Sequence, residues 1–183
     1  MTSSITLPIN IVAKIGEDLP LNNDFYDIQN LNHLYHNFPL FDFIAKRKID
    51  DKYVLFSAKG RNAFSKNGDL NKYYHILTKD KTDENSSQTT ARKITKVIQL
   101  LKNINIIVDI NNITFGFIIC PIKYGSELKY YWGYFSDIKN NINLENLKNG
   151  NCGFLSVPVT PEKLETYNIF GVQSWDYIKT KYL

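Results

Sequence analysis

Two apolar runs separated by a short polar break constrain the fold of this chain more than any other feature of its sequence. The first run is FDFIA, which begins at Phe41, and the second is YVLFSAK, which ends at Lys59. Asp50-Asp51 form the polar break between them. Runs rich in β-branched and aromatic residues favour strands, and a short polar connection lets two strands pair. We therefore expect strands at about 41–47 and 53–59.

Other segments predict a mixed sheet with flanking helices. Segment 86–102 has the apolar residues Ala91, Ile94, Val97, Ile98 and Leu101 on one helical face. A tight turn at Asn67-Gly68 precedes a strand or strand extension at 73–77. INIIVDI (104–110) and ITFGFIIC (113–120) flank Asn111-Asn112, which predicts a hairpin, and KYYWGYF (129–135) predicts a further strand.

The two ends of the chain contribute further elements. ITLPINIVAKIGEDL (5–19) is compatible with a strand or with a short helix after Pro8, and FYDIQNLNHLYH (25–36) predicts a strand. Helices are expected near Pro161 and near Ser174, and the Asn-rich segment 140–151 is expected to be an exposed loop. This order of helices and strands predicts an α/β (mixed α+β) fold with a central mixed sheet.

Size and composition predict one domain. The 183 residues, 43% of them hydrophobic, can bury a substantial core. We expect a single domain over 1–183, with a core at about 11–122 and a C-terminal elaboration at about 123–183. Cys120 and Cys152 are too few for a disulfide scaffold and are expected to be buried reduced thiols in a cytoplasmic protein. No apolar run approaches the ~20 residues that cross a bilayer, so no membrane association is expected.

Asp42 and Lys59 are the main candidates for chemistry. If the two apolar runs are neighbouring strands, these side chains reach one pocket at the edge of a sheet. A carboxylate there can hold a divalent cation on a phosphate, and a lysine can orient water or stabilise developing charge. The sequence has no glycine-rich phosphate loop, which disfavours nucleotide hydrolysis of the P-loop type.

The pattern of an Asp, a gap and then acid-any-Lys resembles the PD-(D/E)xK nuclease superfamily, which has a restriction-endonuclease-like fold. The resemblance covers about 11–61, with helix 86–102 as support. Pro39 lies three residues before Asp42, and the place of the second acid holds Ser57. The resemblance implies that Asp42 ligates Mg²⁺ (or Mn²⁺) and that Lys59 positions water or stabilises charge.

The resemblance also implies supporting residues. The main-chain carbonyl of Ala58 would be a further metal ligand, and Ser57 would contribute a neutral oxygen or a water-mediated contact. Glu17, in KIGED, would provide the glutamate that many members carry on the preceding helix. DNA is the expected partner, and a homodimer is expected by analogy with nucleases that cut both strands.

A basic stretch of the chain agrees with a nucleic-acid partner. It extends from Lys46 to Lys81 and includes Lys79. Within it, Lys46, Arg61, Lys66 and Lys72 are candidates for phosphate contacts. We give equal weight to the interpretation that the stretch is a solvated lysine-rich surface, whose lysines reflect the codon bias of an AT-rich genome. Aromatic residues at 130–135 can stack bases, although alternating aromatics in a strand more often build a core.

Three functions therefore remain open from the sequence. The first is a metal-dependent endonuclease acting on DNA. The second is a non-catalytic protein of the same fold that binds nucleic acid or a protein partner. The third is an unrelated mixed-sheet interaction protein. A second carboxylate near Asp42 would favour the first of these.

Overall fold

A computed structural model describes residues 4–76, 86–154 and 158–183. The helices are α1 (Ile9–Glu17), α2 (Leu31–Leu34), α3 (Ser86–Asn103), α4 (Leu144–Lys148), α5 (Pro161–Leu164), α6 (Trp175–Tyr182) and the 3₁₀ helix η1 (Phe135–Asp137). The strands are β1 (Phe25–Asn30), β2 (Phe43–Arg47), β3 (Tyr53–Asn62), β4 (Tyr74–His75), β5 (Ile113–Ile122), β6 (Leu128–Tyr134), β7 (Pro158–Val159) and β8 (Asn168–Gln173).

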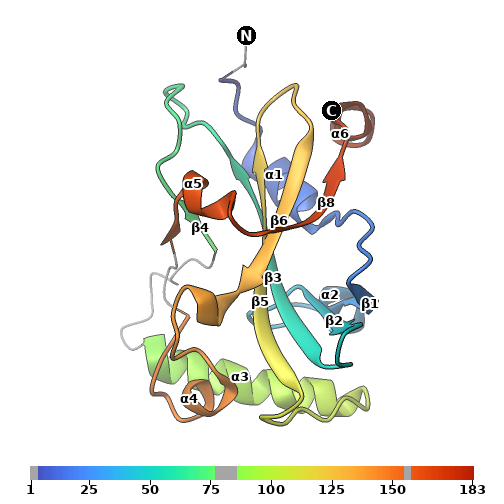
Figure 1. Cartoon of the computed structure of the whole chain (residues 1–183), viewed down its shortest axis with the longest axis vertical. Helices are drawn as coiled ribbons and strands as arrows, with labels where there is room; N and C mark the ends of the chain where they lie inside the picture. The colour runs from blue at the N-terminus through green and yellow to red at the C-terminus, as the bar shows by residue number, and fades with distance from the viewer. Residues whose placement is uncertain (1–3, 77–85, 155–157) are drawn as a thin grey trace.

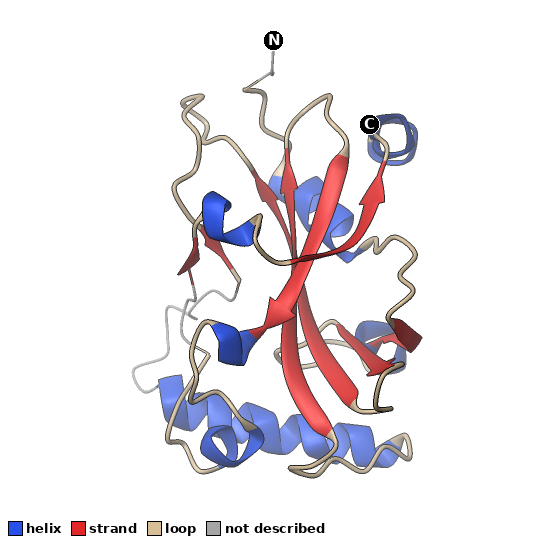
Figure 2. Ribbon diagram, in the orientation of Figure 1, coloured by secondary structure: helices blue, strands red, loops and turns tan. Residues whose placement is uncertain are grey.

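Six of these strands form one mixed sheet in the order β1-β2-β3-β5-β6-β8. Strands β3 and β5 are parallel, and every other neighbouring pair is antiparallel. Because parallel neighbours need a crossover, the chain returns from β3 to β5 through α3. Figures 1 and 2 show β3 and β5 side by side, with α3 crossing beyond one end of them. The mixed α/β fold expected from the sequence is confirmed.

Alternating side chains of the sheet build two hydrophobic cores, one on each face. Leu55 of β3 and Phe117 of β5 pack with α3 and α4 on one face. Phe56 and Ile118, their neighbours in sequence, pack with α1 on the other face. This period of two is the normal consequence of strand geometry. The sheet is therefore covered on both sides, which explains why β3 and β5 are nearly continuous apolar runs.

A backbone contact fixes α1 against β3. A Cβ atom added to Gly16 would lie 2.0 Å from the nitrogen of Gly60, and one added to Gly60 would lie 2.2 Å from the carbonyl oxygen of Val12. Only glycine permits this approach at either position. The contact brings the C-terminal end of α1, and with it Glu17, beside the second half of β3.

Most of the predicted elements are present. The strands expected at 41–47 and 53–59 are β2 and β3, the helix expected at 86–102 is α3, and 129–135 contains β6. Segment 5–19 contains the short helix α1 after Pro8, and Ser174 caps α6 by accepting a hydrogen bond from the Tyr177 nitrogen. The turn at Gly68 has a φ of +86°. Both cysteines are buried and free.

The predicted hairpin at 104–120 is wrong. Segment 104–110 is not a strand, because the amides of Ile104 and Ile106 bond to the last turn of α3 and Asn105 has a φ of +65°. The following turn is held by side chains, with the Asp109 amide donating to Oδ1 of Asn112 at 2.8 Å. β5 pairs instead with β3 and β6.

Three further predictions need correction. The strand expected at 25–36 is β1 only as far as Asn30, and Leu31–Leu34 form helix α2. The Asn-rich segment 140–151 contains α4, and its residues Ile142 and Leu147 are buried in the core rather than lying in an exposed loop. The strand expected at 73–77 is only β4, which pairs with β7 in a small separate sheet. Residue 77, together with Lys79 and Lys81 of the basic stretch, lies outside the described residues. None of the helices in the described part combines the length and apolar character needed to cross a membrane.

Candidate functional site

Asp42 and Lys59 converge where β2 begins. The Asp42 amide donates to the carbonyl of Phe56 (2.8 Å), which extends the β2–β3 pairing by one residue. Oδ2 of Asp42 accepts a hydrogen bond from the amide of Ala58 at 2.7 Å and lies 4.0 Å from Nζ of Lys59. The Asp42 side chain is 13% exposed and that of Lys59 is 32% exposed. The two groups therefore meet at a solvent-accessible edge of the sheet.

Glu17 brings a second carboxylate to this edge. It is the last residue of α1, which the Gly16–Gly60 contact holds against β3. Partial burial raises the pKa of Glu17, the charge of Asp42 raises it further, and the charge of Lys59 opposes the shift. This mutual influence indicates that the three side chains share one electrostatic site. The sequence indicated Glu17 only by resemblance, because the approach of α1 depends on tertiary contacts.

The environment of Asp42 favours its neutral form. Burial raises the pKa of this carboxyl, while Lys59 and the hydrogen bond from the Ala58 amide lower it and only partly offset the effect. A divalent cation would reverse this balance, because it favours both ionised carboxylates and screens their repulsion. Lys59 alone therefore does not neutralise the two carboxylates of the site.

The backbone of β3 adds an oxygen on the same side. Residues of a strand alternate in the direction of their backbone groups, and each residue points its N–H and C=O to the same side. Since the Ala58 amide donates to Asp42, the Ala58 carbonyl also points towards the side of β3 where β2 has ended. Two carboxylates and one carbonyl are ligands that Mg²⁺ and Mn²⁺ accept, with water completing the shell.

Ser57 does not reach this oxygen set. Its side chain is fully buried, and its Oγ has no hydrogen-bond partner among the described residues. No cluster of three or more His, Cys, Asp or Glu side chains suited to a metal occurs in the described part of the chain. The donors that fit a cation are therefore Asp42, Glu17 and the Ala58 carbonyl, without Ser57.

The four predicted phosphate-binding residues lie at different places. Lys46 lies at the far end of β2 from Asp42 and packs over the rings of Tyr26 and Tyr53. Arg61 lies beyond Lys59 on β3, and its guanidinium donates to the carbonyls of His75 and Gly60 at 3.0 Å. Lys66 and Lys72 are exposed in the segment between β3 and β4. Arg61 is thus the nearest of the four to Lys59 along the chain.

Sequence reasoning missed the residues that hold the end of α1. The hydroxyl of Tyr130 donates to the carbonyl of Ile15 at 2.6 Å, and the side-chain amide of Gln173 donates to the carbonyl of Asp18. The Ile15 carbonyl also accepts from the Asp18 amide at 3.2 Å, so the side-chain bonds reinforce the C-terminal end of α1. The partners are 115 and 155 residues apart in sequence, so no local pattern could have indicated them.

Comparison of the chain with protein-family models, with curated proteins and with solved structures found no match.

Proposed function

We propose that this protein is a metal-dependent endonuclease-like enzyme that acts on DNA phosphodiester bonds. The observation that carries the proposal is the approach of Asp42, Lys59 and Glu17 at one accessible sheet edge, with Oδ2 of Asp42 4.0 Å from Nζ of Lys59. Carboxylates beside a lysine are the groups that metal-assisted phosphodiester hydrolysis needs. The low exposure of the Asp42 side chain (13%) strengthens its electrostatic effect on a bound phosphate.

Each group has a distinct role in the proposal. Asp42, Glu17 and the Ala58 carbonyl hold Mg²⁺ or Mn²⁺, which when bound supplies Lewis-acid activation of the phosphate. Lys59 orients the attacking water or stabilises the negative charge that develops on the phosphate oxygens. The hydrogen bond from the Ala58 amide holds the Asp42 carboxylate in position. Arg61 and the exposed Lys66 and Lys72 provide positive charge for the DNA backbone.

The topology supports the same proposal. Helix α1, the antiparallel strands β1, β2 and β3, the crossover helix α3 and the parallel strand β5 occur in this order along the chain, with the short elements α2 and β4 between them. This agrees with the family core of strands followed by a crossover helix. The predicted metal-binding Asp42 directly precedes the second of these strands, and Lys59 lies on the third, close to the arrangement that the resemblance implies.

Nuclease assays with matched variants test the proposal. We expect the wild type to cut DNA with Mg²⁺ or Mn²⁺ and not in excess chelator. Asp42→Asn, Glu17→Gln and Lys59→Met should each reduce the rate at least about 100-fold, as loss of a transition-state charge contact does. Asp69→Asn and Lys96→Met, at exposed positions elsewhere, are the controls. Full activity in Asp42→Asn would refute the assignment.

A second candidate function is nucleic-acid or protein binding without catalysis, and Ser57 is the observation that favours it. A buried serine in place of the second acid leaves a cation with fewer ligands than a three-acid site. In that case the wild type should be inert, and Ser57→Glu should gain metal binding and metal-dependent cleavage. Continued inertness of a Ser57→Glu variant that circular dichroism shows to be folded, without metal binding in calorimetry, would count against the nuclease resemblance itself.

The proposal includes a symmetric dimer, since two copies of the site can act on both strands of a duplex. Light scattering of the protein alone and with duplex DNA measures this. A monomer in both conditions would restrict the proposed activity to one strand at a time.

A further inference from the structure

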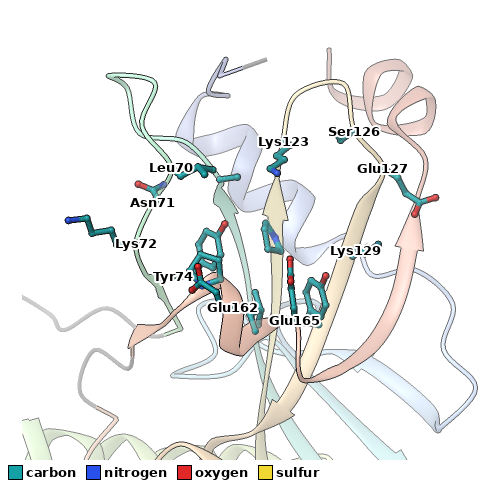
Figure 3. A pocket seen from close by; sticks show the side chains of 15 residues that line it. Leu70, Asn71, Lys72, Tyr74, Lys123, Ser126, Glu127, Lys129, Glu162 and Glu165 are labelled. Atoms are coloured by element: carbon teal, nitrogen blue, oxygen red, sulfur yellow. The ribbon is translucent and has the colours of Figure 1, made fainter. Parts of the chain in front are cut away.

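A cavity of about 720 Å³ lies beyond the candidate site, between α5 and β4 on one side and the ends of β5 and β6 on the other. Its apolar lining includes Ala63, Pro121 and Leu164. This volume lies within the range of about 300–1,000 Å³ that small-molecule sites occupy. Figure 3 shows the labelled polar side chains around it.

Two buried tyrosines provide aromatic walls. Tyr74 of β4 is 5% exposed and Tyr131 of β6 is 9% exposed, and both line the cavity. No hydrogen bond joins either hydroxyl to another described residue, and neither is one of the fully buried polar atoms without a partner, so both hydroxyls keep some exposure. The cavity therefore presents rings for stacking and hydroxyl groups that a ligand can satisfy.

Two carboxylates flank these tyrosines. Glu162 and Glu165 line the cavity and form no ion pair with any described residue. Burial raises the pKa of Tyr74 to about 12, and the charges of Glu165 and Glu162 add to the shift. Burial and the charge of Glu165 also raise the pKa of Tyr131. This end of the cavity therefore favours a group that donates hydrogen bonds.

Lysines provide the opposite charge around the same cavity. Lys72, Lys123 and Lys129 belong to the lining, and all three are exposed. Lys123 follows β5, and Lys129 lies two residues before Tyr131 on β6, so its side chain points to the same face as that ring. In Figure 3 Lys123 and Lys72 lie on different sides of the opening. These cations disfavour a purely cationic ligand, just as the glutamates disfavour a purely anionic one.

We propose that the cavity binds a nucleotide, with its base between the tyrosines and the glutamates and its phosphate towards the lysines. A nucleotide combines a flat ring, N–H donors and an anion in one molecule, as this lining requires. Guanine is the expected base, because its N1–H and N2–H groups are adjacent donors that one carboxylate can accept together. The other common bases do not present two such adjacent donors to a carboxylate.

Arg61 connects the cavity to the candidate nuclease site. It lies two residues after Lys59, so both side chains point to the same face of β3. Its Nε donates to the carbonyl of His75, the neighbour of Tyr74. Ala63 is four residues beyond Lys59, about 13 Å along an extended chain. The nucleotide can therefore belong to a DNA strand that passes Asp42, an extension that rests on the proposed function.

Titration calorimetry in excess chelator tests nucleotide binding without any cleavage. We expect guanosine 5′-monophosphate to bind at least about tenfold more tightly than the adenosine, cytidine and uridine monophosphates, as one bidentate contact provides. Glu165→Gln and Glu162→Gln should remove this preference, and Tyr131→Phe should weaken binding through the hydroxyl. Glu145→Gln, on α4 away from the cavity, should bind like the wild type. Circular dichroism confirms that each variant is folded.

The same titration on Asp42→Asn separates this inference from the proposed function. If Asp42→Asn binds guanosine monophosphate like the wild type but no longer cuts DNA, both the nucleotide site and the proposed nuclease function are supported. If the wild type binds guanosine monophosphate but never cuts DNA, only the nucleotide site is supported. If a guanine-containing oligonucleotide displaces guanosine monophosphate and oligothymidine does not, the cavity binds a nucleotide within a DNA strand. If neither oligonucleotide displaces it, the cavity binds free nucleotides. Absence of binding for all four monophosphates, or equal binding unaffected by Glu165→Gln, would overturn the inference.

Discussion

At the scale of single residues, Asp42 combines a chemical role with a cost in stability. Burial raises the pKa of its carboxyl against the opposing effects of Lys59 and the Ala58 amide. The native state therefore binds the proton more tightly than the unfolded chain does, in which the pKa is about 3.8. By linkage, the contribution of Asp42 to stability is greatest below that pKa and is lost as the pH rises through the higher native value.

This linkage predicts the behaviour of Asp42→Asn. The amide keeps an oxygen that can accept from Ala58 and has no proton to lose. We expect the variant to be more stable than the wild type at pH 7, with the difference shrinking as the pH falls towards 3.8. Urea denaturation at a series of pH values measures it. A variant that is less stable than the wild type at pH 7 would show that the Lys59 ion pair outweighs burial.

At the scale of elements, the packing of α1 on β3 places Glu17. A Cβ on Gly60 would lie 2.2 Å from the carbonyl oxygen of Val12, a distance that forces α1 to move. We expect Gly60→Ala to lower the free energy of unfolding by about 2–3 kcal/mol, as overpacking does. Lys14→Ala, at an exposed position of the same helix, should change it by about 0.5 kcal/mol or less. Equal effects of the two substitutions in chemical denaturation would contradict this account.

Helix α6 holds the other side of α1 through Asp18. Oδ2 of Asp18 accepts hydrogen bonds from Tyr177 (2.8 Å), Lys181 (2.9 Å) and Tyr182 (2.7 Å). Burial tends to raise the pKa of Asp18, but the bonds from Lys181 and the two tyrosines outweigh burial and lower it. This stabilisation is therefore present above the unfolded pKa of 3.8 and is lost as the pH falls through the lower native value.

The corresponding prediction concerns Asp18→Asn. We expect a loss of about 1 kcal/mol near pH 7, because the group is partly exposed and solvent screens it. The loss of stability should disappear in acid. Near pH 7 it is opposite in sign to the gain of stability expected for Asp42→Asn. Hydrogen exchange should show faster opening of α6, whereas α3, which lies in the other core, should be unaffected. Uniform acceleration of both helices would mean that α6 opens only with the whole domain.

At the scale of the whole molecule, the net charge of +4 favours the proposed contact with the negatively charged DNA backbone. Binding through phosphates releases counterions, so the logarithm of the affinity should fall linearly with the logarithm of the salt concentration, with a slope of about −0.9 per phosphate contacted in duplex DNA. Lys66→Ala and Lys72→Ala should each reduce the slope by about one if the residue contacts a phosphate. Fluorescence anisotropy measures this. No binding at low salt would favour the mixed-sheet interaction protein.

The elements that the sequence predicted correctly are those with a local cause. Strands β2 and β3 follow from their own apolar runs, α3 follows from apolar residues at helical spacing, and α6 follows from its Ser174 cap. Pairing of the two runs also predicts that Asp42 meets Lys59, and Oδ2 of Asp42 lies 4.0 Å from Nζ of Lys59, although both residues lie beyond the paired register of β2 with β3. The hairpin predicted for 104–110 and 113–120 is wrong because an apolar run does not indicate which segment it pairs with. Strand β5 pairs with β3, which is distant in sequence.

The sequence by itself therefore determined the fold class, the β2–β3 pair and the meeting of one carboxylate with one lysine. Tertiary structure alone decided that Glu17 joins them, because the packing of α1 on β3, including the close contact of Gly16 with Gly60, places the end of α1 there. It also decided that the Ser57 hydroxyl is buried and has no hydrogen-bond partner among the described residues. The cavity is again a tertiary feature, since its lining comes from segments between Ala63 and Glu165. Sequence periodicity and turn motifs reflect interactions between residues that are close in sequence. The tertiary contacts of Glu17, of Ser57 and of the cavity depend instead on how whole elements pack.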